Sequence, residues 1–387
     1  HAASPPQQPR SGAVAGGAGA FGVAAPSACS TGTSPVPYQP NGRPRVLITG
    51  ATGLLGRQVL KVFDDEWEVR ALGHSHARPP IIACDLTGNG AAAMQIEEFQ
   101  PHVVLHLAAE RRHDVINKDH SKAEVLNVDV TASMAAAAER HGSWLIFLST
   151  DRVFDGAKPP FTVDQTPSPL SEYGKQKLRA ERVVLTASSR AAVLRVPTLY
   201  GPVNELKESA VTSLYADLLN GVKKVDNWTY RYPTWAADVA GVLRAMVDLH
   251  CSGQAVQGVF HWRSQEKFTK FEMMKLLADI GGLDASDVVP ISTTPVAPRL
   301  DDLVLDCSRL EALIEGSKFR TAFRIGLAIC LAPFKASELE AGGNSQAGCV
   351  TVWRSLNETL KSFSNIAPDG NDAAAEERTA SPPIEDE

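Results

Sequence analysis

The segment RVLITGATGLLG, residues 45–56, decides the fold. It begins with an apolar run, residues 45–49, that predicts a buried β-strand, and it continues into three glycines with the spacing G-x-x-G-x-x-G. An apolar stretch with helical period follows, up to residue 63. The segment therefore predicts the first strand–turn–helix unit of an α/β domain.

Each glycine of this turn has its own physical role. Gly50 permits the tight turn, Gly53 lets the backbone approach a pyrophosphate, and Gly56 lets the helix pack closely on the strand. The amino terminus of the helix then offers unpaired N–H groups and a partial positive charge to phosphates. The turn predicts a dinucleotide-binding site.

The alternation of strands and helices continues along the chain. Further apolar strands are predicted at residues 68–72, 102–107, 144–148 and 192–196, and helices at residues 91–99, 132–140 and 173–185. Strands that are apolar on both faces, separated by amphipathic helices, indicate a parallel sheet covered on both sides. We therefore predict an α/β fold with a Rossmann-type, doubly wound parallel sheet.

Beyond residue 200 the alternation loosens, and a smaller C-terminal α/β lobe is expected, mainly at residues 200–330. Its predicted elements are helices at 208–221, 236–249 and 270–281 and a strand at 259–262. Residues 1–43 are rich in Ala, Gly and Pro, and residues 335–387 diverge and become acidic toward their end. Such segments bury too little apolar surface to offset their ordering entropy, so we expect disordered tails around a domain at residues 44–334.

Composition limits the class of protein. The 387 residues carry a net charge of −6, whereas nucleic-acid-binding proteins normally present a basic face. No apolar run approaches the roughly 18–20 residues that span a bilayer. The six cysteines are scattered and lack metal-ligand spacing. We therefore expect a soluble, cytoplasmic protein with reduced thiols, no metal site, and neither nucleic acid nor membrane as a partner.

The tip of the second strand indicates the cofactor. An NAD-specific enzyme typically carries Asp or Glu there to bind the ribose 2′-hydroxyl. Residues 73–78, GHSHAR, contain no acid. The side chains of residues 74–76 can receive a 2′-phosphate, which predicts NADP or NADPH. Asp85 and Leu86, after the next short strand, are expected at the adenine.

Tyr173 and Lys177 lie four residues apart, on one face of a predicted helix. A phenol with a pKa of about 10 is a poor acid at neutral pH, so we expect Lys177 to lower the pKa of Tyr173 and to hold the nicotinamide ribose. Thr150 ends a buried strand and is expected to hydrogen-bond a substrate carbonyl. Together Thr150, Tyr173 and Lys177 predict a catalytic group for hydride transfer at a C–OH/C=O centre.

Several motifs together resemble a known family. They are TGATGLLG at 49–56, AAERR at 108–112, STDRVFDG at 149–156 and YGK at 173–175. This set is similar to the extended short-chain dehydrogenases/reductases of the dTDP-4-dehydrorhamnose reductase (RmlD-like) branch. QPHV at 100–103, ESAVT at 208–212, FHW at 260–262 and FRIG at 323–326 resemble the methionine adenosyltransferase regulatory beta subunits of that branch. The resemblance covers residues 44 to about 334.

The resemblance implies an enzyme regulator more than an enzyme. The beta subunits bind the catalytic subunit of methionine adenosyltransferase, which makes S-adenosylmethionine from methionine and ATP, modulate its kinetics, and keep a pocket for NADP. In such a hetero-oligomer the catalytic group would be vestigial. The cofactor-binding residues expected from the turn, the strand tip, the helix and the resemblance are Gly50, Thr52, Gly53, Leu54, Leu55, Gly56, His74, Ser75, His76, Asp85, Leu86, Leu107, Arg111, Tyr173, Lys177 and Leu199.

The chain departs from the family at three places. Ser75 and His76 stand where the family usually has arginines, and Arg152 stands where both groups of relatives have tyrosine. The residues after Phe334 do not match the family's short tail, which contacts the catalytic subunit.

The alternative function is an NADPH-dependent reductase of a nucleotide sugar. Such an enzyme must bind a pyrophosphate, so Arg or Lys side chains from residues 200–300 should converge on the pocket. The candidates are Lys207, Lys223, Lys224 and Arg231. A third hypothesis, an epimerase or dehydratase, would use Asp151 as an additional acid or base.

Overall fold

The structure is a computed structural model of the chain, and it describes residues 42–63, 66–292 and 302–341. Most of the two tails predicted at residues 1–43 and 335–387 lies outside these residues. The last described helix, α11 (Phe323–Ala341), crosses the boundary that was predicted after residue 334.

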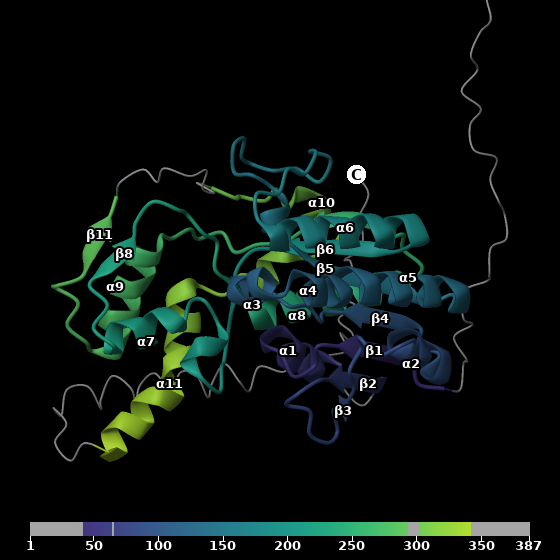
Figure 1. Cartoon of the computed structure of the whole chain (residues 1–387), viewed down its shortest axis with the longest axis horizontal. Helices are drawn as coiled ribbons and strands as arrows, with labels where there is room; N and C mark the ends of the chain where they lie inside the picture. The colour runs from purple at the N-terminus through teal and green to yellow at the C-terminus, as the bar shows by residue number, and fades with distance from the viewer. Residues whose placement is uncertain (1–41, 64–65, 293–301, 342–387) are drawn as a thin grey trace, which may run out of the picture.

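A seven-stranded sheet forms the centre of the larger unit (Figure 1). Its strands are β1 (Arg45–Thr49), β2 (Glu68–Gly73), β3 (Ile82–Ala83), β4 (Val103–His106), β5 (Trp144–Thr150), β6 (Ala192–Val196) and β10 (Gly258–His261). Their order across the sheet is β10-β6-β5-β4-β1-β2-β3, and all neighbours pair in parallel. The chain winds outward from β1 to β3 and then returns to β4 on the other side of β1. This order confirms the predicted doubly wound Rossmann-type sheet, in which ligands bind where the winding reverses.

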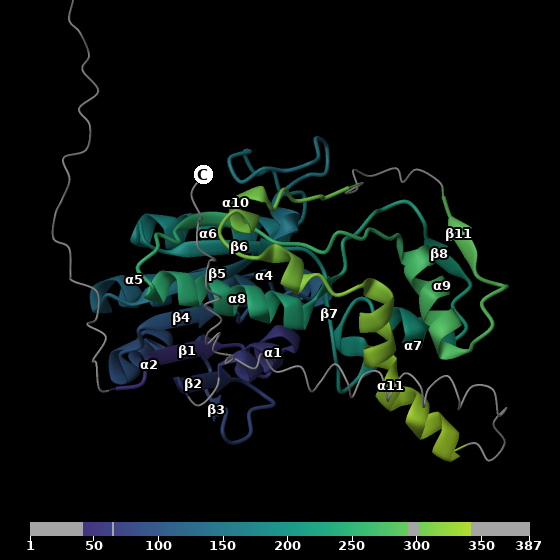
Figure 2. The same ribbon diagram turned by 180° about the vertical axis from the view of Figure 1, so that it is seen from behind.

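Helices cover both faces of this sheet. α2 (Ala91–Phe99), α5 (Val130–His141) and α6 (Glu172–Ala187) share one core cluster, and α1 (Leu54–Val62) and α8 (Ala236–Cys251) share the other. Figure 1 shows α5 and α6 in front of the sheet, and Figure 2 shows α8 on the opposite side. Successive residues of β1 supply the two cores alternately, because side chains of a strand point to opposite faces.

The smaller lobe has its own apolar core beside the end of the sheet (Figure 1). Its elements are α7 (Ser213–Leu219), α9 (Lys270–Gly281), α11, and the parallel strands β8 (Lys224–Asp226) and β11 (Val289–Ile291). A second short parallel pair, β7 (Leu199–Tyr200) with β9 (Thr234–Trp235), connects the lobe to the main sheet.

The structure divides residues 200–330 differently from the sequence-based expectation. Strand β10, which was expected in the lobe, pairs with β6 as the edge strand of the main sheet. Helix α8, also expected there, packs on α1. The chain therefore leaves the main unit for the lobe, returns through α8 and β10, and enters the lobe again with α9. Local hydrophobic patterns do not contain this information, because a pairing between residues 192–196 and 258–261 is non-local.

The remaining short elements are α3 (His113–Lys118), α4 (His120–Glu124), the π-helical turn η1 (Val125–Asp129), α10 (Ser308–Glu311), and the 3₁₀ turns η2 (Asp151–Val153), η3 (Leu206–Glu208) and η4 (Gly316–Phe319). None of the helices in the described part of the chain combines the length and apolarity needed to cross a membrane. Four cysteines in the same part are free thiols: Cys84, Cys251, Cys307 and Cys330.

Candidate functional site

A cavity of about 770 Å³ lies at the carboxyl edge of the main sheet, where β1, β2, β4, β5 and β6 end. Its lining includes every predicted cofactor and catalytic residue except one. The predicted residues that line it are Gly50, Thr52, Gly53, Leu54, Leu55, Gly56, His74, Ser75, Asp85, Leu86, Leu107, Arg111, Thr150, Tyr173, Lys177 and Leu199. His76 is exposed and is not part of the lining.

The glycine turn at one end of the cavity leaves no room for side chains at two positions. Gly50 has a φ of +69°, and a Cβ there would lie 2.9 Å from the backbone nitrogen of Ala108. A Cβ at Gly56 would collide with the Gly50 carbonyl oxygen and lie 2.6 Å from the Cα of Ala51. The turn therefore packs backbone against backbone, and α1 begins directly behind it at Leu54. This arrangement leaves the N–H groups at the start of α1 for a phosphate.

Arg57, which the sequence analysis did not single out, ties this turn to the chain beyond β7. Its guanidinium donates to the Thr52 carbonyl oxygen (2.9 Å) and forms an ion pair with Glu208 (2.6 Å). Arg111 donates to the backbone carbonyl of Glu208 from the other side of the cavity (2.5 Å). The segment around η3 is thus anchored at the rim of the cavity by two arginines.

At the tip of β2, His74 and Ser75 line the cavity and are exposed, and the tip carries no carboxylate. Asp85 also lines the cavity. Its carboxylate accepts hydrogen bonds from the backbone N–H (3.0 Å) and the hydroxyl (2.6 Å) of Thr87, which hold the pKa of Asp85 below its usual range. Asp85 is therefore an ionised, oriented acceptor in the lining of the cavity, and its contact with adenine stays a prediction.

The other end of the cavity holds the predicted catalytic group. Thr150 ends β5, and its hydroxyl donates to Asp151 (3.1 Å) and accepts from the backbone N–H of Arg152 (3.2 Å). Tyr173 and Lys177 come from the first turns of α6, which begins with the N-cap Ser171. The structure thus brings Thr150, Tyr173 and Lys177 to one place.

The electrostatics of this group differ from the expectation. The buried ammonium of Lys177 donates to the Leu148 carbonyl oxygen (2.6 Å) and lies 3.8 Å from the centre of the Phe147 ring. Burial lowers the pKa of Lys177 to about 7, and it raises the pKa of Tyr173 to about 12. The positive charges that counteract the rise in the pKa of Tyr173 belong to Arg111 and Arg152. The prediction that Lys177 plays this role was wrong.

Behind Lys177 lies a buried ion pair that the sequence analysis also missed. Glu181, one helical turn beyond Lys177 on α6, accepts two hydrogen bonds from Arg195 of β6 (2.9 and 2.6 Å) and one from the hydroxyl of Ser149 of β5. The side chains of Glu181 and Arg195 are only 2% and 4% exposed. This pair fixes α6, and with it the catalytic group, to two strands of the sheet. In the sequence, polar side chains recur every four residues at 173, 177 and 181, and this spacing could have indicated that Glu181 lies on the same face of the helix as Tyr173 and Lys177.

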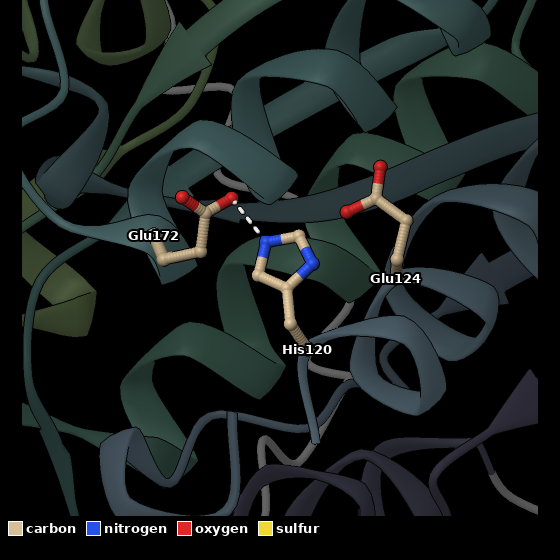
Figure 3. A group of neighbouring side chains, drawn as sticks. All are labelled: His120, Glu124 and Glu172. Atoms are coloured by element: carbon tan, nitrogen blue, oxygen red, sulfur yellow. Dashed lines mark ion pairs between the residues drawn. The ribbon is translucent and has the colours of Figure 1, made fainter. Parts of the chain in front are cut away.

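One group of possible metal ligands occurs among the described residues: His120, Glu124 and Glu172, with ligand atoms within 4.8 Å of one another. Figure 3 shows the imidazole of His120 between the two carboxylates, paired with Glu172 at 2.8 Å. Arg179 already forms ion pairs with both Glu124 (2.5 Å) and Glu172 (3.2 Å). The group therefore has its own cation, and it acts as an ion-pair network that joins α4 to the start of α6.

The lobe brings fewer of the predicted cations to the cavity than expected. Lys207, Lys223 and Lys224 are exposed and do not line it. Arg231 is partly buried, pairs with Asp226 (3.2 Å), and acts electrostatically on Asp151. Lys270, at the start of α9, was not among the predicted cations, but its charge interacts with those of Arg231 and Arg152.

Comparison with known proteins identifies the family. The model of the RmlD substrate binding domain matches residues 44–335. Methionine adenosyltransferase 2 subunit beta of Xenopus tropicalis is 43% identical over 295 residues, which are 75% of this chain and 88% of that protein. The protein of the same name from Rattus norvegicus is 44% identical over the same lengths.

Solved structures agree on the fold. A dTDP-4-dehydrorhamnose reductase from Bacillus anthracis in complex with NADP has a TM-score of 0.63 at 22% identity, over 76% of this chain and all of that one. The enzyme WbmG of Bordetella bronchiseptica in complex with NAD has a TM-score of 0.62 at 22% identity, over 77% of this chain and 96% of that one. The doubly wound sheet, the matched domain and the identity over most of both chains place this chain in the RmlD-like family, among the methionine adenosyltransferase 2 beta subunits.

Proposed function

We propose that this chain is a regulatory subunit of methionine adenosyltransferase that binds NADP(H) in its Rossmann pocket and modulates the catalytic subunit without turning over the cofactor. The observation that carries the proposal is the identity of 43–44% with proteins named as subunit beta, over 88% of their length. Binding of the catalytic subunit would make the chain part of a cytoplasmic hetero-oligomer.

The geometry of the cavity supports the dinucleotide part of the proposal. The turn at Gly50 offers backbone N–H groups to the pyrophosphate, and Asp85 is held as an acceptor for adenine. His74 and Ser75 carry no negative charge, so they are compatible with a 2′-phosphate. These features favour NADP over NAD.

Co-purification tests the regulatory proposal. The full chain, carrying an affinity tag, is mixed with the catalytic methionine adenosyltransferase subunit, with and without NADP. We expect a stable complex and a change in the rate of S-adenosylmethionine synthesis. Absence of a complex at micromolar concentrations of both proteins contradicts the proposal, and a variant that ends at residue 341 shows whether the divergent tail takes part.

A second function is favoured by one observation: Thr150, Tyr173 and Lys177 all line the same cavity. These residues would support reduction of a nucleotide sugar by NADPH. The test is NADPH oxidation with a dTDP-4-dehydro sugar, with Tyr173→Phe as the matched variant. Turnover that falls by at least roughly 100-fold in this variant would establish a reductase. Equal background rates in both proteins would exclude this substrate.

A further inference from the structure

Arg152 is an unpaired cation at the Tyr173 end of the cavity. It is the middle residue of η2, it lines the cavity, and it is partly buried. In the described part of the chain its guanidinium has no hydrogen-bond or ion-pair partner. A guanidinium carries five N–H donors in a planar fork, and a partly buried fork without acceptors is unfavourable. The N–H groups of the Arg152 guanidinium are therefore available to donate to an acceptor on a ligand.

The backbone fixes Arg152 beside Tyr173. The N–H of Arg152 donates to the hydroxyl of Thr150, and its carbonyl oxygen packs so closely on Gly174 that a Cβ there would collide with it. Gly174 directly follows Tyr173 in α6. Turn η2 and the first turn of α6 are thus in direct backbone contact, and the position of Arg152 relative to the phenol does not depend on a flexible loop.

Other basic side chains, carried by different elements, lie near Arg152 or Tyr173. The ring of His113, at the start of α3, lies edge-on to the Tyr173 ring with centroids 6.2 Å apart. Arg231 and Lys270 come from the lobe, where a backbone bridge between Arg231 and Phe268 places the two segments side by side. Lys270 likewise has no hydrogen-bond or ion-pair partner among the residues that the structure describes.

These positive charges repel one another, and nearby carboxylates offset them only in part. After burial, the charge of Arg152 contributes to lowering the pKa of His113, of Arg231 and of Lys270. Asp226 is already paired with Arg231. Asp151 is buried and its pKa is raised to about 6, so at neutral pH its carboxylate is largely ionised and offsets part of the charge of Arg152 and Arg231.

We propose that Arg152, flanked by Lys270 and Arg231, forms a subsite for the carboxylate or phosphate group of a small organic ligand that binds beside Tyr173. A carboxylate or phosphate accepts two parallel hydrogen bonds from a guanidinium and relieves the repulsion among the three cations. Arg152, Lys270 and Arg231 are not among the residues predicted to hold the dinucleotide, so the ligand of this subsite is additional to it. The inference deepens the proposed function: it rests on the same pocket and assigns an anionic ligand class to the part of it beside Arg152.

Calorimetric titration of the full chain, saturated with NADP, tests the subsite. The probes are inorganic phosphate, succinate and, as an uncharged control, glycerol, at constant ionic strength. We expect saturable binding of phosphate or succinate and none of glycerol, and the stronger of the two anions identifies the preferred group. Arg152→Gln should weaken that binding at least about tenfold, since a charged hydrogen-bonding partner is removed.

The matched control is Arg112→Gln, because the guanidinium of Arg112 is already bound by Glu110 (2.6 Å) and is exposed at the rim. We expect anion binding within about twofold of the parent chain for this variant. Lys270→Gln, outside η2, should weaken binding roughly threefold or more, and it serves if Arg152→Gln does not fold.

Two outcomes overturn the subsite: no saturable uptake of either anion by the parent chain, or equal weakening by Arg152→Gln and Arg112→Gln. The titration is repeated without NADP to separate this inference from the proposed function. A chain that binds NADP and no anion refutes the subsite alone. A chain that binds the anion and takes up no NADP refutes the dinucleotide pocket and leaves the subsite standing.

Discussion

At one end of the cavity the glycine turn presents backbone atoms, and at the other end β5, η2 and α6 present charged and hydroxyl side chains. The turn end is built from residues 50–56, which are neighbours in the chain. The Tyr173 end gathers side chains from α3, β5, η2 and α6, and its buried support reaches β6. A site made from one short segment depends on local sterics, whereas a site made from many elements depends on how the whole sheet is assembled.

The largest expected effect concerns the support of the Tyr173 end. Glu181→Gln leaves Arg195 as a buried charge without its partner, so we expect the free energy of unfolding to fall by about 3–5 kcal/mol. Urea unfolding followed by circular dichroism measures the loss.

The control for Glu181 is Glu124→Gln, which breaks a more exposed pair with Arg179. We expect a loss of about 1 kcal/mol or less there. Similar losses in the two variants would show that the buried pair does not hold α6 in place.

At the turn end, Gly56→Ala should destabilise the fold by about 1–3 kcal/mol and abolish saturable NADP binding, because the new Cβ forces α1 away from the turn. Fluorescence titration with NADPH measures the second effect. Gly88→Ala is the control, since a Cβ there makes only ordinary contacts at 3.4 Å. Retained affinity in Gly56→Ala would mean that the turn tolerates displacement and does not position the pyrophosphate.

Cofactor choice is a smaller effect at the same end. Ser75→Glu places a carboxylate where the structure has none, so it should repel a 2′-phosphate and accept from a 2′-hydroxyl. We expect the ratio of NADP to NAD affinity to fall by roughly tenfold or more. Ser252→Glu, the same change at an exposed position after α8, controls for net charge. An unchanged ratio in Ser75→Glu argues against this loop as the 2′-phosphate site.

The smallest expected effect is a pH dependence at the Tyr173 end. Burial lowers the pKa of Lys177 to about 7, so the ammonium loses its proton near neutrality. An anionic cofactor favours the charged form, so its affinity should be highest below pH 7 and fall roughly threefold between pH 6.5 and 8.

The carboxyl group of Asp151, with a pKa of about 6, also becomes more negative as the pH rises and could lower the affinity for an anionic cofactor. The Lys177→Met variant separates the ionisation of Lys177 from that of Asp151. In that variant the part of the decrease centred near pH 7 should disappear. A pH profile identical to that of the parent chain would show that Lys177 stays charged throughout.

Particular elements show how far sequence reasoning reached. The helix predicted at residues 91–99 and the strand at 192–196 are confirmed at the same bounds, because their apolar period is strong and glycine or turn residues bound them. The helix predicted at 208–221 is instead the short turn η3 followed by α7. Ser209 and Thr212 explain the break, since their side chains hydrogen-bond locally and end the helical pattern.

The sequence by itself determined the Rossmann class, the glycine turn, the four-residue spacing of Tyr173 and Lys177, and the family. All of these follow from period, local sterics and motif, which are properties of neighbouring residues. Only the tertiary structure decided that β10 returns to the main sheet, that Glu181 and Arg195 support α6 from behind, and that Lys270 lies near enough to Arg152 for their charges to interact. Those contacts join residues far apart in the chain, and strand order and packing set them, so no local pattern contains them.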